Sequence, residues 1–422
     1  MSPEHSTGMF SREHALALDA ADPLRSMRDR FDLPPDGIYL DGNSLGPLPR
    51  GVAEAVATTV RHAWGTRLIR SWNEADWFAS SSRVGALVAP LIGASPHEVV
   101  VCDSLSVNLF KCMAAALRIQ APAGRRTIVS EVGNFPSDAY INQGVARTFG
   151  ATVVDVDPAD VASAIADVGK DLAVVQLTHA HYRTGEVYDM AAITELTHRH
   201  GGLAVWDLAH SAGALPVELN FCNADFAAGC TYKYLNGGPG APGFVFTAER
   251  HHDGLSQPMS GWCGHANPFA FDHAFTPAAG MGPMLVGTPP ILAMVALEEA
   301  LRLWDDVDMQ QLRAKSMAMG DLFIRLADDR LHTYGFGIAS PRDATQRGSQ
   351  VSLTHPEGFS IMQALIARNI IGDFRAPEIL RFGFTPLYLG YADVWDAIDA
   401  LVDVMKTGEW DHPEFRVRHT VT

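Results

Sequence analysis

Residues 224–240 read Ala-Asp-Phe-Ala-Ala-Gly-Cys-Thr-Tyr-Lys-Tyr-Leu-Asn-Gly-Gly-Pro-Gly. A short apolar run leads to Lys233, and a glycine-rich turn follows at once. Lys233 is the only lysine between Lys170 and Lys315. A lysine held among apolar and aromatic neighbours has its charged form disfavoured, which makes its amine a usable nucleophile and a candidate for Schiff-base chemistry. The alternative interpretation is a lysine at a strand end that reaches toward solvent.

A second stretch, residues 203–213, reads Leu-Ala-Val-Trp-Asp-Leu-Ala-His-Ser-Ala-Gly. It predicts a buried strand that ends at Asp207, and ligands of open α/β sheets bind beyond such strand ends. The interval to Lys233 leaves room for a crossover and one more strand. A carboxylate beside a pyridine nitrogen and a lysine for an aldehyde are the two groups that pyridoxal phosphate (PLP) requires of a protein. The alternatives are a helix N-cap for Asp207 and a core histidine for His210.

Composition narrows the class of protein. The chain has 422 residues, of which 47% are hydrophobic and 19% charged, which predicts a large core and two domains. The net charge of −16, from 32 basic and 48 acidic residues, argues against a nucleic-acid partner. Five cysteines without a Cys-x-x-Cys pair argue against a disulfide framework or a zinc ribbon. Without a long apolar run or a secretory signal, we expect a cytoplasmic protein that does not enter a membrane.

The two stretches resemble the kynureninases, which are PLP enzymes of the aspartate-aminotransferase fold (fold type I, class V branch). The resemblance runs from about residue 39 to about residue 388 in the family's order. The Asn-Phe-Pro-Ser-Asp and Gly-Trp-Cys-Gly-His stretches make it specific. These two are residues 134–138 and 261–265, and the further matching stretches are residues 39–47, 103–109, 182–185 and 380–388.

The resemblance implies an α/β protein with the PLP-dependent transferase fold type I. Its large domain would hold a mostly parallel sheet of the seven-stranded type, and a smaller α+β domain would follow. Alternation of strand and helix patterns before Lys233 independently predicts a mostly parallel sheet. We predict an N-terminal segment at 1–48 that associates with the small domain, a PLP-binding domain at 49–295 and a small domain at 296–422. Residues 13–30 and 49–64 are each predicted to form one helix.

The predicted cofactor site lies where strands end and helices begin. The helix expected after residue 104 offers backbone N–H groups to an anion, and the resemblance makes that anion the PLP phosphate, contacted by Leu105 and Ser106. Phe135 follows a strand and can stack on the pyridine ring. The alternative for the first helix is that a serine at its start serves only as an ordinary N-cap. The alternative for Asp138 is that it serves only as the N-cap of the helix that follows. The resemblance adds to the cofactor-binding set Pro136, Ser137, Asp138, Thr178, His210, Tyr232, Trp262 and Thr288.

Trp262 is expected to donate its indole N–H to the phosphate of the neighbouring subunit, which implies a homodimer. In some relatives an Asn stands at the position of Thr288, and the resemblance implies that the threonine hydroxyl can still donate to the phosphate. His179 and His181 are spaced two apart, but no further ligands stand in register, so we expect no metal site.

The predicted substrate contacts are Arg381, Ser44 and Trp64. Arg381 lies in a strand expected at 380–384, where it needs an anionic partner, and a bidentate grip on the substrate's α-carboxylate fits it. The alternative is a structural salt bridge. Trp64 belongs to an aromatic cluster with Trp72, Trp77 and Phe78, which forms either core or a lining for the substrate ring.

The resemblance implies hydrolysis of L-kynurenine, or of 3-hydroxy-L-kynurenine, to the anthranilate and L-alanine, a step of tryptophan catabolism and NAD biosynthesis. Lys233 would move the α-proton, Asp207 would hold the ring nitrogen protonated, and Tyr232 would transfer a proton or contact the phosphate. His210 would contact the phosphate or order Asp207. The alternatives are another class V activity, such as an aminotransferase, and a non-catalytic PLP-fold binding protein. A desulfurase needs a late catalytic cysteine, and none follows Cys263.

Overall fold

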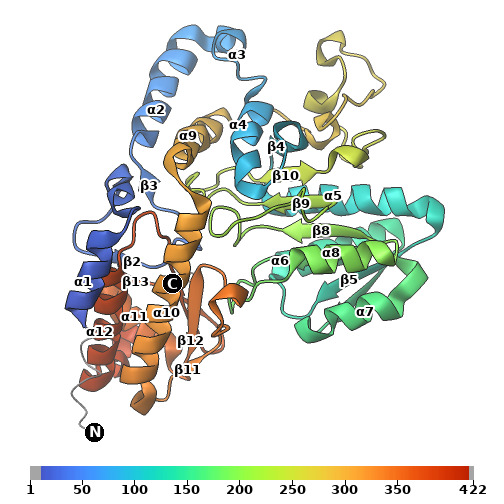
Figure 1. Ribbon diagram of the computed structural model, residues 1–422. Coiled ribbons are helices and arrows are strands. Elements are labelled where there is room, and N and C mark those ends of the chain that lie inside the picture. The colour runs from blue at the N-terminus through green and yellow to red at the C-terminus, as the bar shows by residue number, and fades with distance from the viewer. Residues whose placement is uncertain (1–10, 418–422) are drawn as a thin grey trace. The chain divides into compact units, whose positions relative to one another are not determined.

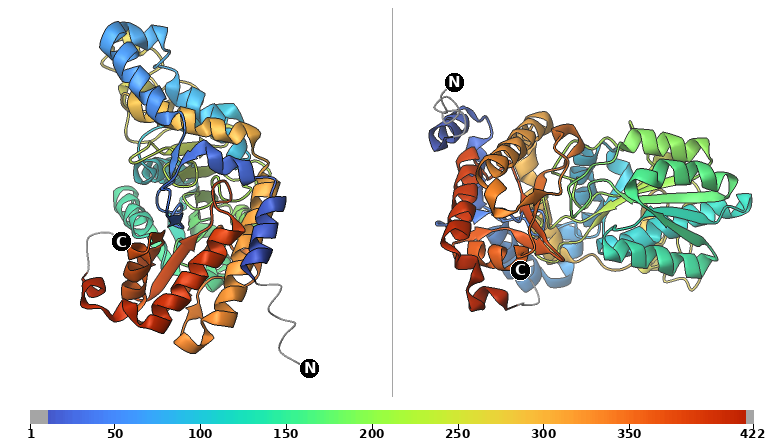
Figure 2. Two further views of the ribbon diagram at one scale, coloured as in Figure 1. Left: turned by 90° about the vertical axis from the view of Figure 1, so that its left-hand side faces the viewer. Right: turned by 90° about the horizontal axis from the view of Figure 1, so that it is seen from below.

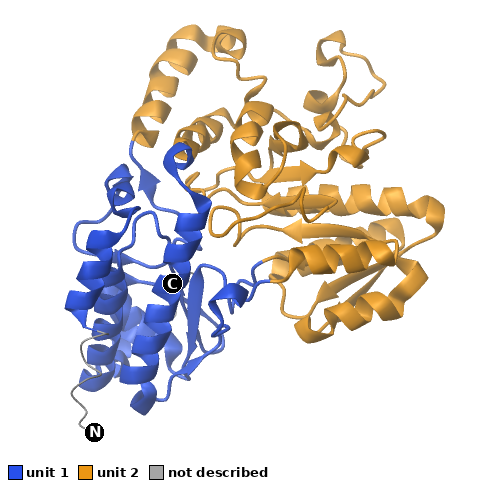
Figure 3. Ribbon diagram, viewed as in Figure 1, with its two compact units in different colours: residues 1–50, 180–187, 303–422 blue, residues 51–179, 188–302 orange. Residues whose placement is uncertain are grey.

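A computed structural model describes residues 11–417, and its internal contacts divide the chain into two compact units (Figure 3). Unit 1 contains residues 1–50, 180–187 and 303–422, and unit 2 contains residues 51–179 and 188–302. The predicted domain ranges did not include the excursion of 180–187 into unit 1.

Unit 2 is built on one seven-stranded sheet in the order β4-β10-β9-β8-β7-β5-β6. Only β10 runs antiparallel to its neighbours, so the prediction of a mostly parallel sheet is confirmed. The strands are nearly all buried on both faces, as parallel strands covered by helices are. Their bounds are β4 Val99–Val101, β5 Thr127–Glu131, β6 Thr152–Val156, β7 Leu172–Thr178, β8 Leu203–Asp207, β9 Phe226–Gly229 and β10 Phe244–Thr247.

Helices cover both faces of this sheet (Figures 1 and 2). On one side α5 (Leu105–Gln120) and α6 (Pro136–Phe149) pack against each other and against the strands. On the other, α7 (Val161–Val168) and α8 (Met190–Arg199) do the same. The apolar face of α5 and the strand residues opposite it form the main core cluster.

The predicted helix at 49–64 begins later and changes its winding. Helix α2 spans Val52–Thr58 after Gly51, whose φ is +95°, and a π-helical segment η3 continues over Thr59–Arg67. A Cβ on Gly65 would lie 2.9 Å from the carbonyl oxygen of Val60, five residues earlier. Glycine at 65 therefore permits the close approach that the wider turn requires. Unit 2 is completed by α3 Ser71–Glu74, α4 Ser80–Val88 and α9 Ile291–Leu301.

Unit 1 holds a four-stranded antiparallel sheet in the order β11-β12-β15-β14, packed with helices. Two short pairs accompany it, β1 with β3 and, in parallel, β2 with β13. The elements are α1 Arg12–Ala21, β1 Phe31–Asp32, β2 Ile38–Tyr39, β3 Leu48–Pro49, α10 Met309–Arg330, β11 Gly337–Ile338, β12 Gln350–Thr354, α11 Gly358–Ala367, β13 Ile370–Ile371, β14 Asp373–Arg375, β15 Ile379–Gly383 and α12 Tyr391–Thr407.

The prediction of one helix at 13–30 is wrong. Helix α1 ends at Ala21, and a separate 3-10 helix covers Arg25–Arg30. The break falls at Asp22, which adopts an extended conformation with ψ of 118°. Pro23 follows it, and a proline disfavours helical geometry in the residue before it. Asp22 also forms an ion pair with Lys315 of α10 at 2.7 Å, which ties the break to the rest of unit 1.

Three further findings concern the described residues as a whole. No helix in residues 11–417 is both long and apolar enough to span a membrane. The same residues contain no cluster of three or more His, Cys, Asp or Glu arranged to bind a metal ion. All five cysteines are free thiols.

Candidate active site

Two neighbouring strand ends supply the centre of the site in unit 2. Thr178, the last residue of β7, lies directly opposite Asp207, the last residue of β8. Asp207 is only 2% exposed, and its Oδ1 accepts a hydrogen bond of 2.7 Å from the N–H of Ala209. The strand therefore ends in a buried carboxylate, as the sequence predicts.

Lys233 lies in the turn that follows β9. Its Nζ is 2.9 Å from Nε2 of His210, three residues beyond Asp207, and 5.9 Å from the centroid of the Tyr232 ring. The side chain is half-buried. The contact with His210 was not predicted; it gives the lysine amine a direct hydrogen-bond partner.

Asp138 brings a second buried carboxyl to the site from the first turn of α6. It is 1% exposed and lies close enough to Asp207 for the protonation of the two carboxyl groups to be linked. Burial and the charge of Asp207 raise the pKa of Asp138 well above its usual range. Burial also raises the pKa of Asp207, but the Ala209 N–H and the charge of Lys233 oppose this. The proton therefore belongs to Asp138, and Asp207 is the anion of the pair.

A buried polar network stands behind Asp138, and sequence reasoning missed its members Gln176 and Asn142. Gln176 donates to Oδ2 of Asp138 at 3.1 Å and accepts from Asn142 at 2.7 Å. Two signals were available. Gln176 interrupts an otherwise apolar strand run, and Asn142 lies four residues after Asp138, on the same helix face.

The predicted phosphate contacts lie at the start of α5. Ser104 is the N-cap and accepts a hydrogen bond from the N–H of Val107, so the N–H groups of Leu105 and Ser106 are not used within the helix. A Cβ on Gly243 would lie 3.1 Å from the Leu105 nitrogen, so glycine at 243 leaves this approach open. Phe135, 41% exposed, caps α6, and Pro136 and Ser137 are its first residues.

Three further predicted residues of unit 2, namely Trp262, Trp64 and Thr288, lie outside the group formed by Lys233, His210, Asp207 and Asp138. The indole N–H of Trp262 donates to the Pro268 carbonyl at 2.6 Å, and its ring packs against Phe78 and Phe269. Trp64 lies on η3 and is 56% exposed. Thr288 lies in an exposed loop before α9. Trp72 and Trp77 pack edge to face, with centroids 5.9 Å apart, and both are partly exposed.

Arg381 and Ser44, both predicted to bind substrate, meet in unit 1. Arg381 is 1% exposed, and its Nη2 donates to Ser44 Oγ at 3.1 Å. Its Nε donates at 2.7 Å to Asp373, directly opposite on β14, which Nη2 also contacts. Nη1 donates to the Tyr182 carbonyl at 2.7 Å.

Asp373 therefore accepts the two-point hydrogen bond from Arg381 that the sequence analysis assigned to the substrate's α-carboxylate. The sequence analysis did not predict this partner. A guanidinium has five N–H donors, so among the described residues one Nη1 N–H of Arg381 remains open to a ligand. Asp41 adds a further acid here, and burial together with the charge of Asp373 raises its pKa to about 7. Its hydrogen bond with Ser44 and the charges of Arg381 and Arg375 act in the opposite direction.

The donor set of unit 2 fits PLP group by group. A buried anion, Asp207, suits the ring nitrogen, and the amine of Lys233 suits the aldehyde. The free N–H groups at the start of the 16-residue helix α5 suit the phosphate.

Comparisons with known proteins concern the family and the fold of this chain. A family model described as the kynureninase C-terminal domain matches residues 312–401. The chain is 50% identical over 420 residues to a kynureninase of Burkholderia mallei (strain SAVP1), covering 98% of this chain and 100% of the relative. It is 48% identical over 419 residues to a kynureninase of Pseudomonas fluorescens, with the same coverage of 98% and 100%. A solved mutant of C-DES with glycine covalently linked to its PLP cofactor has a TM-score of 0.76 at 19% identity, covers 89% of this chain and 99% of that chain, and shows the shared fold.

Proposed function

The chain belongs to the kynureninase family, and from this membership we infer that Lys233, Asp207 and Asp138 form its catalytic centre. The activity is the PLP-dependent hydrolysis of the Cβ–Cγ bond of L-kynurenine, which gives anthranilate and L-alanine. The observation that carries the assignment of residues is that Asp207, buried at the end of β8, is followed by His210, whose Nε2 lies 2.9 Å from Nζ of Lys233, so that a carboxylate and an amine share one site. Carboxyl pairs whose protons are divided unequally are typical of catalytic sites.

Each residue of this group has a chemical task. PLP, when bound, supplies an electron sink that makes the substrate's α-carbon acidic. Lys233 anchors the cofactor through Nζ and then moves the α-proton, with His210 at 2.9 Å to exchange hydrogen bonds with the amine. Asp207 holds a proton on the ring nitrogen. Cys230 beside it and burial raise the pKa of Tyr232, so its hydroxyl stays protonated and can donate a proton during hydrolysis.

Arg381 and Ser44 are proposed to bind the substrate's α-carboxylate. What supports this is the open N–H on Nη1 of Arg381. The Ser44 hydroxyl accepts from the same guanidinium at 3.1 Å and donates to Asp373 at 3.2 Å, so it would have to turn from Asp373 to reach the substrate. Asp373 keeps the guanidinium plane fixed, so the open donor has a defined direction. Trp64 is proposed to contact the aromatic ring of the substrate, which its exposed indole supports.

The test of the reaction is incubation of the PLP-loaded protein with L-kynurenine and, separately, 3-hydroxy-L-kynurenine. Anthranilate is followed by fluorescence and alanine by a coupled assay. We expect the two products in equal amounts. Absorbance of a bound cofactor without anthranilate would contradict the reaction and favour an aminotransferase, whereas a protein that takes up no PLP would favour a non-catalytic binding role.

We further propose that the active form is a homodimer. Unit 2 exposes an aromatic cluster in which Trp262, Phe269 and Phe271 are 41%, 63% and 74% exposed, and such patches are typical of interfaces. Donation from Trp262 to a partner's phosphate would require its bond to Pro268 to be exchanged. Light scattering gives the mass in solution, and a monomeric, fully active protein would refute this proposal.

The cytoplasm is the proposed location. The five free thiols support it, because secreted proteins tend to pair their cysteines. Fractionation of cells with an antibody to the protein tests this, and recovery outside the cytoplasm would refute it.

A further inference from the structure

A buried lysine lies on helix α5, two turns after its start. Lys111 is 0% exposed, and its Nζ donates to the Met284 carbonyl at 2.6 Å. The same Nζ donates to Oδ2 of Asp103 at 2.8 Å and to Sγ of Cys102 at 3.3 Å. These three bonds use all the N–H donors of an ammonium group, and two of them end in the turn between β4 and α5. Lys111 therefore holds that turn.

The turn between β4 and α5 has a backbone that most residues avoid. Asp103 has a φ of +48°, in the left-handed region. Its carbonyl accepts a hydrogen bond of 2.7 Å from the N–H of Gly243, the residue before β10, and β10 pairs with β4 (Figure 1). Asp103 is thus fixed on one side through its carbonyl group and on the other through its carboxylate, by Lys111.

Three other aspartates show what this residue does in an extended conformation. Asp22, Asp308 and Asp343 have φ values of −72°, −82° and −69° and ψ values of 118°, 113° and 116°. In each, Oδ1 accepts a hydrogen bond of 2.9, 2.7 and 2.9 Å, respectively, from the N–H two residues later, which is an Asx turn. Asp22 does so although it is also paired with Lys315. The backbone conformation, and not the presence of a lysine alone, therefore decides whether the carboxylate takes this N–H.

An Asx turn at Asp103 would place its carboxylate on the N–H of Leu105, two residues later. The left-handed conformation avoids this. Within residues 11–417, no group of the protein accepts a hydrogen bond from the Leu105 N–H. That N–H belongs to the first turn of α5 and is therefore left for an anion from outside the chain.

We propose that Lys111 is a positioning residue of the phosphate end of the cofactor site. By holding the Asp103 carboxylate, it keeps Asp103 left-handed, so that the chain does not cap the Leu105 N–H itself. Its charge also offsets that of Asp103, which repels an anion at the same helix start. This rests on the proposed function, because it takes that anion to be the phosphate of PLP. Lys111 touches neither cofactor nor substrate in this scheme; it acts through Asp103.

The test compares the binding of PLP with that of pyridoxal, which lacks the phosphate, to the full-length protein freed of cofactor. Equilibrium dialysis gives both Kd values without turnover. Lys111→Met keeps a long apolar side chain but removes the ammonium group. We expect the Kd of PLP to rise about tenfold and the Kd of pyridoxal to change less than about twofold. An equal rise for both ligands would mean general damage to the site and would overturn the proposal.

Lys315→Met is the matched control. Lys315 is 6% exposed and binds the Asp22 carboxylate at 2.7 Å and the Pro386 carbonyl at 2.6 Å, so it has the same two kinds of oxygen partner, in unit 1. Both methionine variants should lower the melting temperature. Only Lys111→Met should change the ratio of the two Kd values, and an equal change in the control would contradict the proposal.

A second substitution at Asp103 should suppress the first. Glycine adopts a positive φ without strain and has no carboxylate to place on the Leu105 N–H. In Lys111→Met/Asp103→Gly, the Kd of PLP should therefore return to within about threefold of that of the unaltered protein. If this double variant binds PLP as weakly as Lys111→Met, Lys111 does not act through Asp103 and the proposal is overturned.

A further double variant keeps the proposal testable if Lys111→Met does not fold. Lys111→Met/Asp103→Asn is as free of buried charge as the glycine variant, but its amide oxygen can still form the Asx turn. It should bind PLP about fivefold more weakly than the glycine variant, with equal pyridoxal binding. Equal binding of PLP by the two would overturn the proposal. If the unaltered protein takes up neither PLP nor pyridoxal, the proposed function fails, and this inference fails with it.

Discussion

Two aspartates of unit 2, Asp225 and Asp207, stand at the ends of adjacent strands and differ in nearly everything but their burial. Asp225 comes directly before β9, and Asp207 ends β8. They are 1% and 2% exposed. Asp225 is surrounded by donors, whereas Asp207 shares its site with a second carboxyl group.

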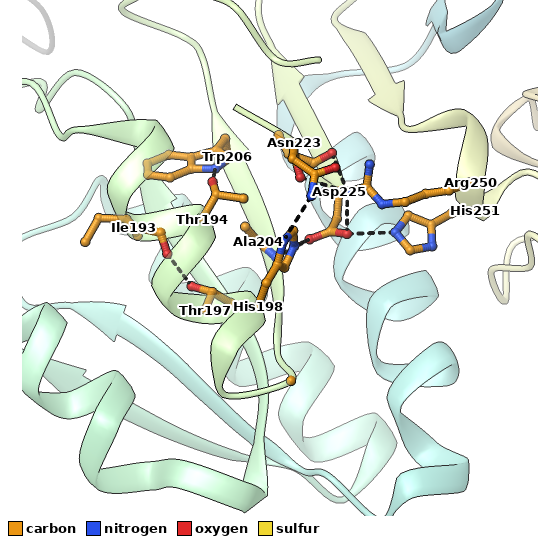
Figure 4. A network of polar contacts seen from close by, with 12 residues as sticks. Ile193, Thr194, Thr197, His198, Ala204, Trp206, Asn223, Asp225, Arg250 and His251 are labelled. Atoms are coloured by element: carbon orange, nitrogen blue, oxygen red, sulfur yellow. Dashed lines mark hydrogen bonds and ion pairs between the residues drawn. The ribbon is translucent and has the colours of Figure 1, made fainter. Parts of the chain in front are cut away.

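The hydrogen bonds of Asp225 use both of its oxygens (Figure 4). Oδ2 accepts from His198 Nε2 at 2.7 Å and from the Ala204 N–H at 2.8 Å, and Oδ1 accepts from Arg250 at 2.8 Å and His251 at 2.7 Å. The Asn223 amide donates to Nδ1 of His198, which leaves the proton on Nε2 for Asp225. Burial alone would raise the pKa of Asp225, but the hydrogen bonds from His198 and His251 outweigh it and hold the pKa well below its usual range.

The difference between the two aspartates lies in how completely the protein itself supplies hydrogen bonds to each carboxylate. Asp225 has every acceptor position filled by the protein, so it serves stability and has no capacity for a ligand. For Asp207, burial raises the pKa and the hydrogen bond from Ala209 only partly opposes it. A ligand with a protonated nitrogen would supply the missing stabilisation, which is why the incomplete site, and not the complete one, is the candidate for binding.

The strongest test of this distinction is Lys233→Ala. We expect loss of the visible absorbance of the bound cofactor and a fall of kcat by about 10⁴-fold, because alanine supplies no amine to hold the aldehyde or to move the α-proton. Absorbance and steady-state kinetics measure the two effects, with the exposed Lys170→Ala as control. A retained absorbance band would place the attachment elsewhere.

Asp207→Asn should cost about 10³-fold in kcat while PLP still binds. Its effect on stability should be small or favourable at neutral pH, because an acid whose pKa is raised in the folded state opposes folding when ionised. Kinetics and urea denaturation are compared on the same preparation. Turnover near that of the unaltered protein would remove Asp207 from the mechanism.

Asp225→Asn should show the reverse pattern, with normal kcat and a loss of about 3 kcal/mol in the free energy of unfolding. Since the pKa of Asp225 is lowered on folding, its contribution is complete above about pH 4 and is lost as pH falls further. The variant should therefore lose less stability than the unaltered protein upon acidification. Urea denaturation against pH measures this, with the exposed Asp253→Asn as control; an equal acid sensitivity would contradict it.

Arg381→Lys tests whether Arg381, most of whose N–H donors are already used within the protein, also binds the substrate's carboxylate. The lysine keeps the positive charge beside Asp373 but lacks the planar set of N–H donors of a guanidinium. We therefore expect KM to rise about tenfold with little change in kcat. Arg375→Lys is the control, because Arg375 also pairs with Asp373, at 2.6 Å. A rise of KM in the Arg375 variant alone would reassign the carboxylate site.

The smallest expected effect is that of Asp41→Asn in unit 1. The pKa of Asp41 is raised to about 7, so its contribution is present below about pH 4 and is lost as pH rises through about 7. The facing groups are Asp373, Arg375, Arg381 and Ser44. The asparagine variant should lose about 1 kcal/mol less stability between about pH 5 and pH 8. Melting temperatures measure this, with the exposed Asp36→Asn as control; parallel pH curves would contradict it.

The sequence predicted most of what lies at strand ends. Asp207 and Thr178 end buried apolar runs, and Lys233 follows one, so periodicity and the family stretches both point to them. The sheet followed from the same alternation. The prediction of one helix at 13–30 is wrong because Pro23 disfavours helical geometry at Asp22, where α1 ends.

The residues that were missed are those whose partners are distant in the chain. Gln176 interacts with Asn142 and Ser130, 34 and 46 residues away, and its polarity within an apolar strand run marks it as unusual without identifying these donors. Asp373 is only 8 residues from Arg381, but it is identifiable as its partner only once β14 and β15 are known to pair in that register. Contacts of this kind follow from tertiary structure, which hydrophobic patterns do not specify.

The parallel pair of β2 with β13 has a consequence during synthesis. Ile38 pairs with Ile370, so the first partner of this ladder leaves the ribosome long before the second exists. At about 5–20 residues per second, the wait is roughly 15–70 s. Unit 2 is encoded between them and can fold in that interval, while the early strand stays without its neighbour. Nascent chains arrested before residue 370 should therefore show a protease-resistant unit 2 and a cleavable segment around residue 38, and factors that shield unpaired strands should act on this protein until residues 370–371 have been made.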